Sequence, residues 1–217
     1  MSETSTRWSL SNFFVKQSKN HKIKIFVAVG VLLVIIFAGL FFCFFGCHRS
    51  EYASSAKLSS AYVAFSQGDK QKGINLLDET IAKYPKMPAA YQARIVRADI
   101  FTEAKEYSEA LKLLRETVSF GKPAVIKPLA NVRIIYVYDS KVDYLNAIDA
   151  SKEFIDKYPD HFLVKDIYLN LAKYYLILGS KDEAVKVFNE VLVNFPATKE
   201  AEKAQTKLNE IKYMQIQ

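Results

Sequence analysis

The sequence predicts an all-α protein: one apolar N-terminal helix, then a solenoid of stacked helical hairpins closed by a capping helix. Two observations carry this prediction, a repeat in the C-terminal part of the chain and an uncharged apolar run before it. The repeat is marked by small residues at intervals of 37, namely Gly73, Ala110, Ala147 and Ala184. A fixed period of roughly 20 to 50 residues is typical of stacked repeats, in which each unit buries its apolar face against its neighbours.

Each repeat predicts two helices. In the last copy, apolar residues at helical spacing form the stripe of a first helix: Tyr168, Leu171, Ala172 and Tyr175. Gly179 interrupts the pattern as a helix C-terminus would. The second helix begins near Asp182, whose charge suits the positive end of a helix, and ends before Pro196. The small residue Ala184 allows the two helices to cross closely.

The pattern resembles the tetratricopeptide repeat. The matching positions of the last copy are Tyr168, Leu171, Ala172, Tyr175, Ala184, Phe188 and Pro196. The resemblance covers about residues 54–213, and the usual period of about 34 means that each copy carries roughly three extra residues. One departure lies at the end of the second copy, where Lys122 stands at the place of Pro85, Pro159 and Pro196.

Residues 197–213 predict the capping helix. Their apolar residues form one narrow stripe, Ala201, Ala204, Leu208 and Ile211, and lysines and glutamates fill much of the remainder. A terminal helix with one apolar and one polar side is what the end of a repeat array needs for solubility.

The run Ile25–Cys47 predicts a membrane-spanning helix, because its 23 residues carry no charge and about 20 suffice to cross a bilayer. A cleaved secretory signal is the alternative, but its apolar region is usually about 7–15 residues long. The predicted organisation is therefore a tail at 1–24, the membrane helix at 25–47, a linker at 48–53 and the repeat domain at 54–213.

Basic residues set the predicted orientation. Those before the apolar run are Arg7, Lys16, Lys19, Lys22 and Lys24, whereas Arg49 and Glu51 nearly cancel after it. By the positive-inside rule, the N-terminus lies in the cytoplasm and the repeats lie on the other side.

The net charge of +7 comes mostly from residues 1–49, which hold six basic residues and one acidic residue. The remainder is nearly balanced and shows no basic stripe, so we expect no nucleic-acid partner.

No catalytic, metal or cofactor motif is present, so we expect a protein without enzymatic activity, cofactor or small-molecule substrate. The histidines His21, His48 and His161 are scattered, and both cysteines lie in the apolar run. Cys47 follows Phe-Phe-Gly, which faintly resembles a lipoprotein cleavage box. The Phe at the usual Leu position and the long preceding segment disfavour lipidation there.

The candidate binding site is the concave surface lined by the first helix of each hairpin. By analogy with tetratricopeptide proteins, its inward residues would be Tyr62, Phe65, Gln92, Asp99, Val132, Arg133, Tyr136, Leu169 and Lys173. Arg133 and Lys173 have the chemistry to bind a ligand carboxylate. The alternative is that they are solvated or pair with neighbouring residues.

The whole architecture resembles the YfgM-like family of bacterial inner-membrane proteins. Local support comes from the pair Phe13-Phe14, the basic stretch that follows it, and the segment 129–134 in a middle helix. The resemblance implies a single-pass protein with a periplasmic repeat domain. It also implies an accessory role at the Sec translocon, handing exported proteins to periplasmic chaperones.

An alternative resemblance lies in the C-terminal stretch from Asn194 to Leu208, which is similar to the periplasmic CpoB-type proteins and to the BamD lipoprotein. Those proteins act in cell-envelope assembly and maintenance. The repeat pattern is common to these families, and the membrane attachment distinguishes them.

Overall fold

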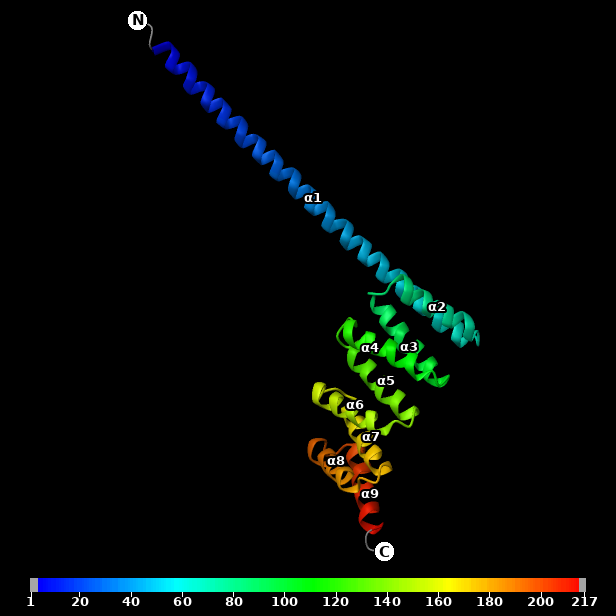
Figure 1. Cartoon of the computed structure of the whole chain (residues 1–217). Helices are drawn as coiled ribbons and strands as arrows, with labels where there is room; N and C mark the ends of the chain where they lie inside the picture. Colours follow the sequence, from blue (N-terminus) through cyan, green and yellow to red (C-terminus); the bar gives the residue numbers. More distant parts are fainter. Residues whose placement is uncertain (1–3, 215–217) are drawn as a thin grey trace. The chain divides into compact units, whose positions relative to one another are not determined.

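The structure, a computed structural model, describes the backbone of residues 4–214 and the side chains of residues 29–41 and 48–213. Residues 4–214 contain helices and no strand (Figure 1). The helices are α1 (Thr4–Ser66), α2 (Lys70–Lys83), α3 (Pro88–Glu103), α4 (Tyr107–Phe120), α5 (Ile126–Ser140), α6 (Tyr144–Lys157), α7 (Val164–Ile177), α8 (Lys181–Asn194) and α9 (Lys199–Met214). The predicted all-α hairpin solenoid is confirmed.

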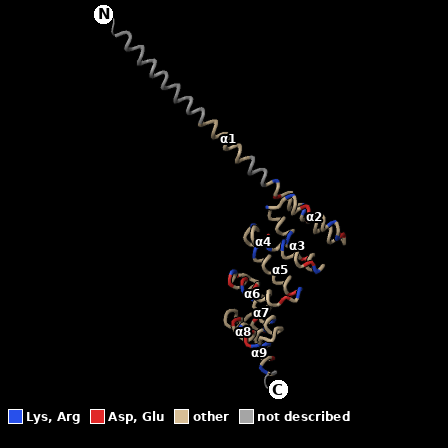
Figure 2. Tube along the Cα trace, viewed as in Figure 1, with Lys and Arg blue, Asp and Glu red and all other residues tan. Residues whose placement is uncertain are grey.

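The chain divides into two units, residues 1–50 and residues 51–217. In the second unit each helix from α2 onward packs against the next, and α3 and α7 also contact α5 and α9 respectively. The end of α1 joins the first hairpin through a cluster of Leu58, Ala61, Leu77, Ala89 and Ala93. Charged residues of both signs are spread over α2 to α9 (Figure 2).

The small residues of the 37-residue register lie where helices cross. Ala110, Ala147 and Ala184 are fully buried, and Gly73 is buried as well. A methyl group on Gly73 would lie 2.5 Å from the nearest ring carbon of Phe65. The first hairpin therefore needs glycine at this position because the Phe65 ring fills the space that alanine occupies in the other copies.

Helix α9 closes the stack as the sequence predicts. Its stripe lies against α7 and α8, with Ala201, Ala204 and Ile211 buried and Leu208 partly buried. The residues between these positions are mostly exposed and polar.

The predicted membrane helix, 25–47, lies within α1, and its side chains are described only in part. Residues 25–28 and 42–47 of that prediction, with Cys47, lie outside the residues whose side chains are described. Among the described residues, no helix combines the length and the apolar character that crossing a bilayer requires. Within Val29–Phe41 the side chains of α1 are largely exposed, and Val34 and Phe37 are the most exposed of them.

Candidate functional site

The predicted groove residues lie on α1, α3, α5 and α7, and most of them line one of two cavities. The N-terminal cavity has a volume of about 320 Å³ and brings together Tyr62, Gln92, Asp99, Val132 and Arg133. The C-terminal cavity has a volume of about 580 Å³ and includes Leu169 and Lys173.

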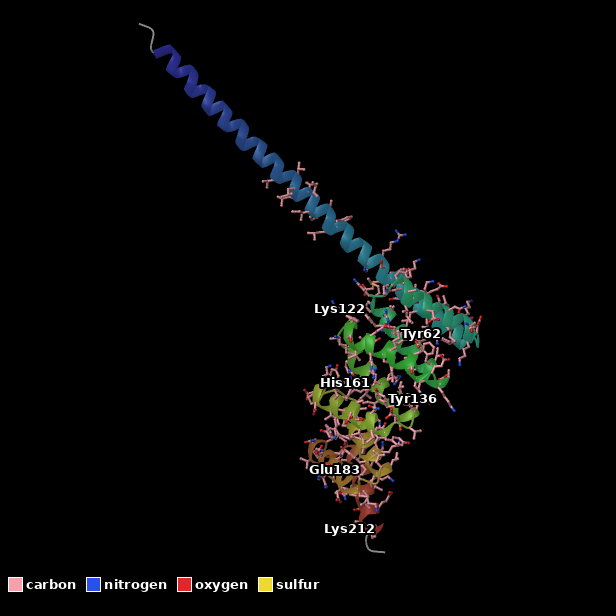
Figure 3. The ribbon with its side chains drawn as sticks, in the orientation of Figure 1. Tyr62, Lys122, Tyr136, His161, Glu183 and Lys212 are labelled. Carbon is pink, nitrogen blue, oxygen red and sulfur yellow. The ribbon has the colours of Figure 1, made fainter. Side chains whose placement is uncertain are left out.

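The other two predicted residues line neither cavity. Phe65 is half-buried, with its ring against Gly73 in the core of the first hairpin. Tyr136 on α5, which is labelled in Figure 3, is more than half exposed, at 55%.

An ion pair between α3 and α5 lines the N-terminal cavity. The Nε of Arg133 lies 3.0 and 3.1 Å from the two carboxylate oxygens of Asp99. Burial raises the pKa of Asp99, and the neighbouring Arg133 only partly opposes this rise. Burial also raises the pKa of Tyr62, with a further contribution from the charge of Asp99. The cavity therefore holds a partly desolvated and neutralised charge pair.

Lys173 forms the corresponding pair between α7 and α5. Its Nζ lies 3.2 Å from a carboxylate oxygen of Asp139, and it also lies 5.4 Å from the centre of the Tyr174 ring. Burial together with Asp139 raises the pKa of Tyr174. Both cations considered for a ligand carboxylate thus have a carboxylate partner within the chain.

The C-terminal cavity lies between α7, α8 and α9 and has an apolar floor with a basic rim. Its floor contains Leu169, Leu176, Phe188 and Ile211. Its rim contains Lys173, Lys181, Lys203 and Lys207, with Glu210 as the one acidic residue. Lys207 pairs with Glu210 at 2.7 Å, whereas Lys181 and Lys203 form no ion pair with any described residue.

This combination suits a segment of a partner protein with an apolar face flanked by carboxylates. Only Leu169 and Lys173 of this cavity are predicted from the sequence, whereas Leu176 and Ile177 of α7 and the residues of α8 and α9 are not. The available signal was the spacing of Lys203, Lys207 and Glu210, which places them on one face of the last helix.

Among the described residues, no three His, Cys, Asp or Glu side chains are grouped so that they could hold a metal ion.

A family model described as a tetratricopeptide repeat-like domain matches residues 19–213. The chain belongs to this family. The tetratricopeptide resemblance is therefore confirmed, and repeats of this kind are typical of non-enzymatic scaffolds that bind other proteins. The narrower YfgM-like relationship stays a prediction.

Solved structures with the same fold include two kinds of repeat protein. The TPR-like repeats of a Podosopora anserina kinesin light chain are 14% identical, with a TM-score of 0.53 over 74% of this chain and 94% of that chain. MamA is 20% identical, with a TM-score of 0.54 over 70% of this chain and 81% of that chain. A Desulfovibrio magneticus RS-1 MamA structure is 17% identical, with a TM-score of 0.52 over 67% and 78% of the two chains. At these identities the likeness shows the fold alone.

One curated relative is the mouse aspartyl/asparaginyl beta-hydroxylase, which is 26% identical over 150 residues. The match covers 67% of this chain but only 20% of the hydroxylase. The chain therefore spans one fifth of the length of that enzyme.

Proposed function

We propose that this protein is a membrane-tethered scaffold that binds segments of other proteins in the C-terminal cavity of its repeat domain. The observation that carries the proposal is the apolar floor of that cavity beneath a rim of four lysines. Apolar floor residues supply binding energy through burial, and Lys181 and Lys203 supply charges that form no ion pair with a described carboxylate.

The proposed tether is the apolar segment 25–47. Its described residues, Val29–Phe41, expose a continuous apolar surface, which is unfavourable in water and favourable in a bilayer. The family match begins at residue 19 and so includes this segment together with the repeats. Basic residues before the segment favour a repeat domain outside the cytoplasm.

Following the YfgM-like resemblance, the membrane is the bacterial inner membrane and the partners are Sec translocon subunits, exported chains and periplasmic chaperones. Tethering keeps the cavity close to the membrane, which raises its effective concentration near chains that emerge there. The role is that of an accessory that hands exported proteins on.

Site-specific photo-crosslinking in intact cells tests this proposal. A photoreactive amino acid replaces Ile177, which lines the cavity and is 47% exposed, and the control position is Val193, which is 77% exposed on α8 and lines no described cavity. We expect translocon subunits or exported chains to crosslink at residue 177 and not at residue 193. Lys181→Gln combined with Lys203→Gln should reduce those products several-fold.

Two outcomes contradict the proposal. Equal crosslinking at both positions would show that the cavity is not the binding site. Recovery of only envelope-assembly proteins, with a mature chain that begins at an acylated Cys47, would favour the CpoB- or BamD-like role instead.

A further inference from the structure

A third cavity lies where the chain leaves α4, apart from both groove cavities. Its volume is about 620 Å³, and Lys122 marks its position in Figure 3. Its lining combines three cations, one carboxylate and two aromatic rings: Pro85, Lys86, Tyr91, Arg94, Glu116, Phe120 and Lys122.

This cavity lies where the second hairpin lacks an aromatic ring that the other hairpins carry. The residue that ends the second helix of a hairpin is Tyr84, Tyr158 or Phe195 in three copies but Gly121 in this one. Gly121 also has a different backbone conformation, with φ −58° and ψ 133° against −134° and 54° at Tyr158.

In the later hairpins the ring contacts the residue 27 positions earlier. The Nδ2 of Asn131 lies 3.3 Å from the hydroxyl of Tyr158, and the rings of Tyr168 and Phe195 lie 5.6 Å apart. The same spacing connects Arg94 to Gly121. Arg94 therefore occupies the position whose equivalents contact the ring at the end of their hairpin, and Gly121 supplies no such ring here.

The Arg94 side chain is fixed by its contacts, but not all of its hydrogen-bond donors have an acceptor. It is 8% exposed, its Nη1 donates to the carbonyl oxygen of Pro85 at 3.1 Å, and its guanidinium lies 5.2 Å from the Tyr91 ring centre. Its Nε lies 3.7 Å from the Glu116 carboxylate, beyond hydrogen-bonding distance. This Nε is the one buried side-chain nitrogen or oxygen without a hydrogen-bond partner among the described residues.

The surroundings of Arg94 favour an anion with an apolar neighbour. Lys86 and Lys122 form no ion pair with described residues, so the lining carries an excess of positive charge over Glu116 alone. Phe120 is 70% exposed beside them, whereas its equivalents in the other hairpins are polar: Lys83, Lys157 and Asn194.

We propose that this cavity binds an acidic side chain of a partner protein, with an aromatic or aliphatic residue of the same partner segment packed on Phe120. The partner carboxylate accepts hydrogen bonds from the Arg94 guanidinium and is attracted by Lys86 and Lys122. The Glu116 side chain is 46% exposed and turns toward solvent when the ligand enters. A protein segment fits better than a free phosphate, because only the segment uses the exposed Phe120 ring. This site does not depend on the function proposed for the C-terminal cavity.

A titration of the full chain in detergent micelles tests the site, with the Arg94 Nε–H signal followed by NMR. The probe is an eight-residue peptide with two glutamates flanking one phenylalanine, and its matched control has two glutamines instead. We expect the glutamate peptide to shift the Arg94 signal and to bind at least ten-fold more tightly than the glutamine peptide. Equal binding of the two peptides would overturn the proposal. So would a shift with inorganic phosphate but none with the glutamate peptide, because that result would assign the site to phosphate groups.

Substitutions give a second test that does not depend on the Arg94 NMR signal, because peptide affinity is measured instead. Glu116→Gln should tighten peptide binding several-fold because it removes the competing carboxylate, and Lys122→Gln should weaken it several-fold. Lys157→Gln is the matched control, since it removes one charge at the corresponding edge of the next hairpin, where Tyr158 is present. Arg94→Gln should abolish binding. If Glu116→Gln weakens binding, or if Lys157→Gln weakens it as much as Lys122→Gln, the proposed site is wrong.

Discussion

One residue in the turn of each hairpin has a left-handed backbone conformation. These residues are Gly68, Lys105, Val142 and Gly179, with φ between 62° and 82° and with the same 37-residue spacing as the helix crossings. Glycine adopts this conformation freely, whereas a β-branched residue in it is strained. The two glycines indicate in the sequence where their turns lie. Lys105 and Val142 give no such signal, because the packing of the flanking helices imposes a conformation that their side chains disfavour.

Val142→Gly should therefore stabilise the repeat domain. Relief of the left-handed conformation is worth about 1–2 kcal/mol, part of which is offset by the greater chain entropy of glycine when unfolded. Val142 is 66% exposed, so little packing is lost. We expect the free energy of unfolding to rise by roughly 0.5–1 kcal/mol, measured by denaturant titration of the full chain in micelles. Val193→Gly is the control, because this exposed valine lies in the last turn of α8 with a helical backbone, so glycine should not raise stability there. A loss of stability in both variants would show that residue 142 is not strained.

The pKa of Asp99 gives a second test at the scale of single residues. Burial raises this pKa above the ordinary value of 3.8, while Arg133 lowers it through its charge and hydrogen bond. A raised pKa in the folded state means that stability from this group is present below its ordinary pKa and is lost as the pH rises through the raised value. Arg133→Gln removes the opposing effect, so the pKa of Asp99 should rise further.

NMR titration of the Asp99 carboxyl carbon measures this directly. Lys173→Gln should leave the titration unchanged, since Lys173 pairs with Asp139 instead. A fall in the pKa after Arg133→Gln would contradict the assignment of Arg133 as the partner of Asp99.

The crossing of helices α1 and α2 depends on Gly73. Alanine is normally better than glycine inside a helix by about 1 kcal/mol. Here the added methyl group would meet the Phe65 ring at 2.5 Å, and overpacking of this kind typically costs about 1–3 kcal/mol. Gly73→Ala should therefore destabilise the chain by about 1 kcal/mol when Phe65 is present.

The same substitution should stabilise a Phe65→Leu chain, because the shorter side chain leaves room for the methyl group and the helix propensity of alanine then decides. A double-mutant cycle of unfolding free energies measures this change of sign. Additive effects of the two substitutions would show that the Phe65 ring is not the reason why position 73 requires glycine.

Prediction from the sequence succeeded for the elements whose signals are local. The hairpin helices and the stripe of α9 follow from periodicity that each segment carries by itself, and the buried small residues follow from their spacing of 37 residues. The candidate site was less predictable. Phe65 was assigned to the groove by analogy, but its orientation depends on which side of α1 the Gly73 crossing occupies. The internal partners of Arg133 and Lys173 depend on how far neighbouring hairpins rotate, and the sequence period does not specify that rotation.

For the repeat domain as a whole, contacts run from each hairpin to the next and not across the domain. Stability in such an array is approximately a sum of repeat and nearest-neighbour contributions, so a destabilising substitution at one end should weaken the nearest hairpins most.

Ala204 on α9 is fully buried against the last hairpin, and Ala204→Glu would bury an unpaired carboxylate there. We expect faster amide hydrogen exchange in α7 and α8 of this variant and unchanged exchange in α2 to α4, measured on the full chain by mass spectrometry. Thr206→Glu, on the exposed side of α9, is the control and should leave both regions unchanged. Equal acceleration from α2 to α8 after Ala204→Glu would mean that the domain unfolds as one unit. In that case a partner bound in the C-terminal cavity would stabilise every hairpin, whereas local coupling confines its effect to α7, α8 and α9.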